Sequence, residues 1–120
     1  MSRLRATIAR LGRMEGFEVS RPGGGEDVKG EWKRNRPSVF EANGSIQQAD
    51  AQTLMLLPEG LRNQETVVVH TDCELRSEDV GAQRQADRLK IRGRIFQVER
   101  LFDYSREGGF FEAICVRLGQ

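Results

Sequence analysis

Short runs of alternating apolar and polar residues fill the C-terminal third of the chain, and such alternation is typical of half-buried β-strands. Leu89 and Ile91 alternate with basic residues in the first run, and longer runs follow over residues 95–104 and 110–118. Gly-containing segments with the composition of tight turns separate the runs. The pattern therefore predicts a β-meander of three strands.

Three further strands are expected upstream of the meander. Residues 17–21 alternate well enough for one strand, and residues 38–46 for another, with a turn or bulge at Asn43-Gly44. Residues 66–70 are rich in β-branched side chains and include three consecutive valines, which indicates a strand buried on both faces. The polar segment that follows, up to Leu89, is expected to be irregular.

One short helix is predicted over residues 49–57. Asp50 has the side chain to cap its start, while Leu54 and Leu57 share one face. Pro58 ends it, because the residue before a proline is pushed out of the α region.

These elements predict a mainly β protein, a small antiparallel β-barrel with the helix plugging one end, because so small a sheet must otherwise expose its apolar face. A length of 120 residues fits one domain. We assign residues 17–120 to the barrel and residues 1–16 to a flexible N-terminal arm. Pro22-Gly23-Gly24-Gly25 is expected to break the regular structure, and residues 22–37 are expected to form a long, mobile, Gly-hinged hairpin or loop.

Composition narrows the classes of function. The chain has 38% hydrophobic and 31% charged residues, and its 19 basic and 18 acidic side chains give a net charge of +1. This balance argues against coating nucleic acid by bulk charge, although a local basic patch remains compatible with it. The sequence contains no apolar run of membrane-spanning length and no secretory leader pattern. A soluble protein made in the cytoplasm, without a membrane partner, is expected.

Candidate catalytic and metal-binding groups are few. His70, Asp72, Cys73 and Glu74 form the densest set of metal ligands, but no second ligand pair completes a site. A nucleophilic pair of His70 with Cys73 or Cys115 would also be conceivable, without any flanking signature to favour it. We therefore expect no enzyme activity, no metal and no cofactor.

Two polar segments are candidate binding surfaces, and we name them the assembly loop and the basic strand. The assembly loop comprises Gly23, Gly24, Gly25, Glu26, Asp27, Trp32, Arg34 and Arg36. The basic strand comprises Arg88, Lys90, Arg92 and Arg94. Since the four basic residues have the same parity, part of the run projects from one sheet face toward DNA phosphates or acidic residues of a partner. The alternative is an ordinary solvent face opposite inward-facing Leu89 and Ile91.

Four segments together resemble a family of small proteins of tailed bacteriophages and prophages, the head-closure or head-tail joining proteins. They are LPEGLR at residues 57–62, TDCELR at 71–76, QADRLKIRGRIFQVERLFDY at 85–104 and GGFFEAICVRL at 108–118. The shared pattern is a helix ending in Leu-Pro-Glu-Gly, a strand with Thr-Asp, Ala-Asp before the meander, and Asp-Tyr before a Gly-Gly turn. The chain departs from the family pattern at Arg92 and Phe96, near the first hairpin.

The resemblance implies a structural virion protein of the neck, synthesised in the bacterial host cytoplasm. It would form an oligomeric ring below the portal, close the packaged head and dock the tail. Its partners would be portal or adaptor proteins, tail proteins and other copies of itself, with non-specific contact to packaged DNA. An alternative from another class is a small nucleic-acid-binding β-barrel, for which Trp32 beside basic residues is the best support.

Overall fold

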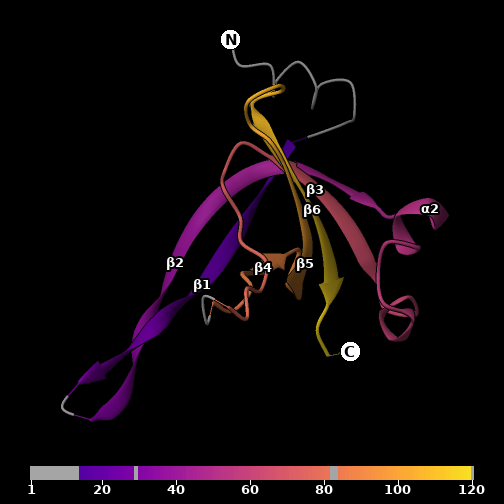
Figure 1. The fold of residues 1–120 in the computed structure, drawn as a ribbon. Helices are drawn as coiled ribbons and strands as arrows, with labels where there is room; N and C mark the ends of the chain where they lie inside the picture. The colour runs from indigo at the N-terminus through magenta and orange to yellow at the C-terminus, as the bar shows by residue number, and fades with distance from the viewer. Residues whose placement is uncertain (1–13, 29, 82–83, 120) are drawn as a thin grey trace.

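The computed structural model describes residues 14–28, 30–81 and 84–119, and of residues 24–28 and 31–35 only the backbone. Six antiparallel strands close into a barrel in the order β1-β2-β3-β6-β5-β4 (Figure 1). The strands are β1 (Met14–Val28), β2 (Glu31–Gln48), β3 (Thr66–Thr71), β4 (Arg88–Ile91), β5 (Arg94–Tyr104) and β6 (Phe110–Arg117). This confirms the expected mainly β barrel with one short helix.

The N-terminal boundary of the barrel differs slightly from the expectation. Residues 1–13 of the expected arm lie outside the described residues. Met14, however, already pairs with Ser45, so that β1 begins before residue 17, where the barrel was expected to start.

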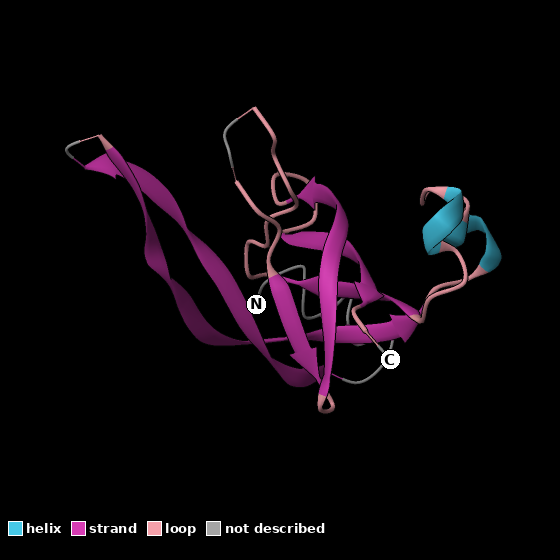
Figure 2. Ribbon diagram, turned by 90° about the horizontal axis from the view of Figure 1, so that it is seen from below, coloured by secondary structure: helices cyan, strands magenta, loops and turns pink. Residues whose placement is uncertain are grey.

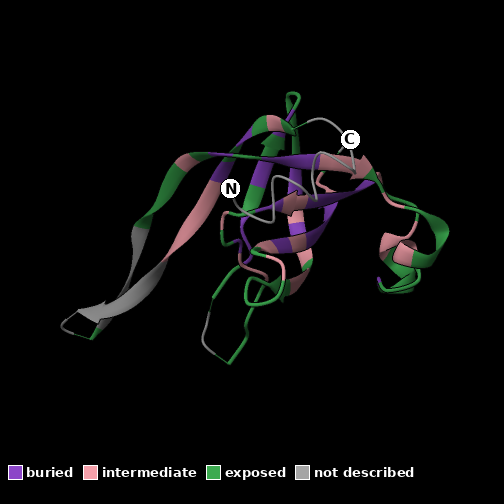
Figure 3. Ribbon diagram, turned by 90° about the horizontal axis from the view of Figure 1, so that it is seen from above, coloured by how far each residue is buried: buried purple, intermediate pink, exposed green. Residues whose placement is uncertain are grey.

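One apolar cluster fills the barrel, and Figure 3 shows the buried residues concentrated on the barrel strands. Leu89 and Ile91 point inward from β4, as the alternation predicts, and Leu75 reaches the same cluster from the long loop of residues 72–87. The buried members are Phe17, Val19, Ala42, Val67, Val69, Leu75, Leu89, Ile91, Phe96, Val98, Ala113 and Cys115. Every strand contributes, which explains why the sheet closes.

The helix is shorter than predicted. Helix α2 (Ala51–Leu54) begins after Asp50, whose Oδ1 accepts a hydrogen bond from the Thr53 N–H at 2.8 Å, as expected of its cap. After α2 the chain makes a tighter, 3₁₀-type turn before Pro58, in which the Leu57 N–H donates a hydrogen bond to the Leu54 carbonyl three residues earlier. A 3₁₀ helix, η1 (Glu59–Leu61), follows.

This helical lobe, defined as residues 50–62, covers the outer wall of the barrel. Leu57 packs with Ile114 and Val116, whereas Ala113 and Cys115 of the same strand belong to the interior cluster. The expectation that the helix plugs one end is therefore wrong. Because β6 has apolar side chains on both faces, its outer face also needs a cover, and the lobe supplies it.

Asn43-Gly44 is neither a turn nor a bulge. Residues 14–21 pair with residues 45–38 in unbroken register. A Cβ on Gly44 would lie 2.5 Å from the His70 carbonyl oxygen, so glycine is required here for β2 and β3 to approach each other. The sequence pattern identifies Gly44 as a special position, but it does not reveal that the reason is the close approach of β2 and β3.

The regular structure does not break at residues 22–25, contrary to expectation. Strands β1 and β2 continue beyond the barrel as a two-stranded hairpin that pairs as far as Val28 and Glu31. The register shifts on both sides of Gly23, where glycines accommodate the irregular backbone. This projecting hairpin, defined as residues 22–37, explains a radius of gyration of 15.3 Å against about 14 Å for a compact chain of this length.

The meander forms as predicted. Arg92 and Gly93 both have positive φ, 52° and 80°, in the two-residue turn between β4 and β5. Between β3 and β4 the chain is irregular, with an isolated bridge between Asp79 and Arg84.

The lobe yields a stability prediction. Leu57 is 2% exposed whereas Leu54 is only partly buried. We expect Leu57→Ala to lower the free energy of unfolding by about 2–5 kcal/mol, because it leaves a cavity over the β6 wall. Leu54→Ala should have a smaller effect. Denaturant melts of both variants measure this, and an equal or larger loss for Leu54→Ala would contradict the packing.

Candidate functional site

The projecting hairpin contains all residues of the assembly loop. Gly23 to Asp27 lie in β1, and Trp32, Arg34 and Arg36 lie in β2. Figures 1 and 2 show the hairpin leaving the barrel on one side, while the helical lobe lies on the other. The backbone of the assembly loop is thus part of a paired ribbon, which reaches beyond the core. Whether it moves in the free chain stays a prediction.

A buried ion pair fixes the base of this hairpin. The side chain of Asp87 is fully buried, and its Oδ1 and Oδ2 accept hydrogen bonds from Nε and Nη2 of Arg21 at 3.1 and 2.9 Å. Nη2 of Arg21 also donates to the Glu74 carbonyl at 2.7 Å. The Arg21 guanidinium lies 5.1 Å from the centre of the Phe40 ring. We call this arrangement the Arg21 clamp.

Every polar group of Asp87 has a partner. Besides Arg21, its Oδ2 accepts from the Arg76 N–H at 2.9 Å, its own N–H donates to the Arg76 carbonyl, and its carbonyl accepts from the Val98 N–H. The hydrogen bonds and charge of Asp87 raise the pKa of Arg21. The clamp therefore joins β1, the 72–87 loop and β5 at one point.

Sequence reasoning missed the clamp. The available signal was Ala86-Asp87 in the segment QADRLKIRGRIFQVERLFDY, where an acid follows an apolar residue directly before a predicted strand. Both residues are buried, at 5% and 0% exposure. A carboxylate at such a position is expected only with a charged partner, because an unpaired buried charge is very costly.

The basic strand is divided by the structure into two kinds of residue. Arg88 and Lys90 are exposed on the outer face of β4, with inward Leu89 between them. No ion pair to either side chain occurs among the residues that the structure describes. Lys90 is the cross-strand neighbour of Glu18 in β1.

Arg92 and Arg94 are neutralised within the chain. Arg92 forms an ion pair with Glu15 through two nitrogens. Nη1 of Arg94 contacts both carboxylate oxygens of Glu65 at 3.0 and 3.2 Å, and Glu65 also binds Arg117 at 3.1 Å. The sequence did not reveal these acids, because they are distant along the chain. The basic strand therefore offers less free positive charge than its composition suggests.

The polar groups considered for catalysis lie on different faces of the barrel wall. His70 binds Glu112 through Nε2 at 3.0 Å on the outer face. Cys115 lies inside, and Cys73 packs against the same interior cluster. Burial raises the pKa of both thiols. The pairing of His70 with a cysteine is thus not assembled. Within the described ranges, no three metal-ligating side chains converge.

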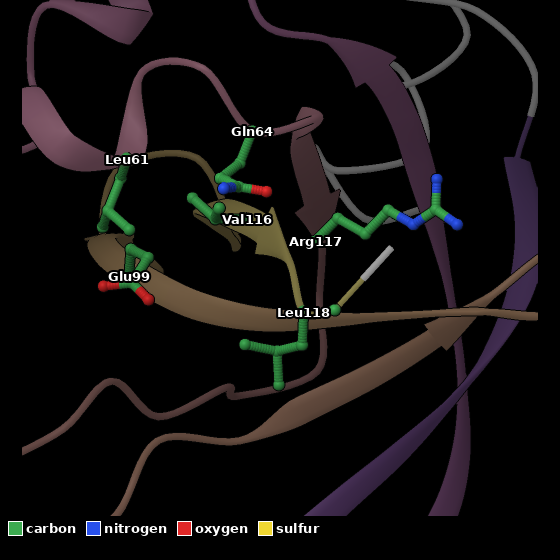
Figure 4. A pocket seen from close by; sticks show the side chains of 7 residues that line it. Leu61, Gln64, Glu99, Val116, Arg117 and Leu118 are labelled. Atoms are coloured by element: carbon green, nitrogen blue, oxygen red, sulfur yellow. The ribbon is translucent and has the colours of Figure 1, made fainter.

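A shallow hollow of about 430 Å³ lies between the helical lobe and the end of β6 (Figure 4). Its wall combines apolar Leu61, Val116 and Leu118 with Gln64, Glu99, Arg117 and Gly119. Arg117 is already paired with Glu65. The hollow has the mixed apolar and polar lining of a surface contact.

No protein-family model matches the chain, and no curated protein is significantly similar to it. Among the described residues, no helix has the length and apolar character needed to cross a membrane.

The clamp yields a second prediction. Asp87→Asn keeps the size of the side chain but leaves Arg21 without its counter-ion, and we expect a loss of about 2–4 kcal/mol in the free energy of unfolding. Glu15→Gln, which opens the exposed pair with Arg92, is the matched control and should cost less than about 1 kcal/mol. Similar losses in denaturant melts of the two variants would show that Asp87 has no special structural role.

Proposed function

We propose that this chain is a structural protein of the head-tail connector of a tailed bacteriophage or prophage. In the virion neck it would form a ring below the portal, close the packaged head and dock the tail. The observation that carries the proposal is a closed barrel with a ribbon projecting from one side and an apolar-tipped lobe on the other (Figures 1 and 2). Such a molecule has two separate surfaces with which to contact different neighbours.

The resemblance supports the same conclusion, because its landmarks coincide with residues that hold the fold. Leu57 anchors the helical lobe, and Asp87 accepts the Arg21 clamp. Thr71 is fully buried, and its hydroxyl donates to the Asn43 carbonyl at 2.8 Å. A pattern built from such positions indicates a shared barrel rather than a shared reaction.

The lobe has the surface expected of a docking element. Met55 and Leu56 are 65% and 45% exposed at its tip. Neighbouring apolar side chains on a projecting segment favour a protein contact. A ring needs heterologous contacts, in which one surface of a copy meets a different surface of the next. The hairpin and the lobe lie on separate sides of the barrel, so each can contact a different neighbour.

A nucleic-acid-binding barrel has weaker support. Stable, sequence-independent binding would need several free cations along a groove with exposed aromatic rings. Arg92 and Arg94 already bind carboxylates of the chain, and Phe96 is buried in the barrel. Arg88 and Lys90 alone would give a weak, salt-sensitive contact with DNA.

Deletion of the gene from an inducible genome that encodes this chain tests the function. We expect cells to accumulate heads that have packaged or lost their DNA, together with separate tails, and few infectious particles. Supplying the chain from a plasmid should restore infectivity. Electron microscopy and titration of lysates measure the outcome. Normal yields of tailed particles, or a block before DNA packaging, would contradict a role in the neck.

A shortened variant, supplied from the same plasmid, tests whether the function needs the hairpin as well as the barrel. Replacing residues 24–34 by a short Gly turn should leave the barrel folded, because its cluster and the Arg21 clamp lie outside this segment. The variant should nevertheless fail to restore infectivity. Full complementation by it would remove the hairpin from the proposed function.

A further inference from the structure

Strand β2 has an open edge next to the barrel. It pairs with β1 between Glu31 and Ser45, but it pairs with β3 only from Gly44 to Gln48. Among the described residues, no strand lies against the other side of β2 before Gly44. Backbone groups on that side are therefore available to another strand, and an open edge is a template for pairing.

The hydrogen-bond pattern shows which groups these are. The Ala49 N–H donates to the Thr66 carbonyl, so Ala49 directs its backbone groups toward β3. Because the direction alternates along an antiparallel strand, the other odd-numbered residues of β2 share it. The register with β1 is unbroken from Ser45 back to Ser38. Val39 and Glu41 consequently direct their N–H and C=O groups to the open edge, whereas Ala42 faces β1.

Both ends of the open edge are defined. At the barrel end, the Asn43 carbonyl is taken by the hydroxyl of Thr71 at 2.8 Å. At the other end, Pro37 has no N–H to donate. Between them, Val39 is 60% exposed and Glu41 is also exposed. This stretch offers two backbone donor and acceptor pairs against which no described strand lies.

Strand β1 presents a complementary edge in the same hairpin. It pairs with β4 only from Glu18 to Ser20, so from Gly23 to Val28 it too lacks a neighbour on its far side among the described residues. One hairpin thus has two different free edges, on opposite sides. Edges of this kind can join copies head to tail, which closes a ring when the rotation allows it.

We propose that the open β2 edge at Val39 and Glu41 binds the β1 edge of a second copy's hairpin by strand addition. The contact continues the antiparallel order from copy to copy, and backbone hydrogen bonds supply most of it. This rests on the proposed function, since it names the contact that would hold the ring together. The carboxylate of Glu41 limits indiscriminate pairing of the edge, as charged residues do on natural edge strands.

Sedimentation of the full chain from about 1 µM to about 1 mM tests the proposal. The wild-type chain should form species larger than a dimer as its concentration rises. Glu41→Pro removes one N–H from the open edge but none that faces β1, and should weaken association by about tenfold or more. Glu41→Gln keeps the N–H and the size, and should associate at least as well as the wild type.

Amide hydrogen exchange of the wild-type chain gives a readout that does not depend on the proline variant folding. Protection of the Val39 and Glu41 amides should rise with concentration, while protection of the Ala42 amide, which faces β1, should not. A monomer at every concentration, association of Glu41→Pro like the wild type, or a two-fold dimer as the largest species would each overturn the proposal.

The two proposals fail separately. If gene deletion leaves tailless heads but the chain remains monomeric, the neck function stands and strand addition is wrong. If the chain associates through this edge but deletion leaves particle yields unchanged, the self-contact is real and the neck function is wrong.

Discussion

The ion pair between Arg21 and Asp87 is the interaction on which the arrangement of the molecule depends. The side chain of Asp87 is fully buried, and hydrogen bonds from the Arg21 guanidinium and the Arg76 N–H compensate the lost hydration of its carboxylate. Because Arg21 stands where β1 leaves the barrel, the same contact fixes the direction of the projecting hairpin. It also holds the 72–87 loop, from which Leu75 enters the core. A rigid base lets a two-stranded ribbon, which is marginal alone, extend from the barrel.

Much of the fold follows from alternation and turn chemistry. The meander, the valine-rich strand β3 and the helix cap at Asp50 can be predicted from the sequence, because each depends on residues that are neighbours along the chain. What alternation could not reveal is which side of a strand faces inward when both sides are apolar. Ile114 and Val116 have the character of interior residues of β6, yet they lie on its outer face and contact Leu57 of the helical lobe. The lobe therefore covers the outer wall of the barrel and does not close one of its ends.

The candidate surfaces were identified from local composition, which does not reveal strand pairing or ion pairs between residues that are distant along the chain. Gly23 to Gly25 indicated a loop, but glycine also suits the irregular register of a ribbon, which is how the structure uses it. Arg92 and Arg94 indicated a basic patch until Glu15 and Glu65 were brought beside them by the closure of the barrel. The open edge at Val39 and Glu41 has no sequence signature at all, since it consists of backbone groups.

The proposed place in a phage neck would be tested most directly by a localised cryo-electron microscopy reconstruction of mature tailed particles produced from the genome that encodes this chain. The reconstruction should show copies of this barrel in a ring immediately below the portal, with the hairpins of adjacent copies side by side. A neck built entirely from other chains, with this barrel absent from the particle or confined to the distal tail, would contradict it.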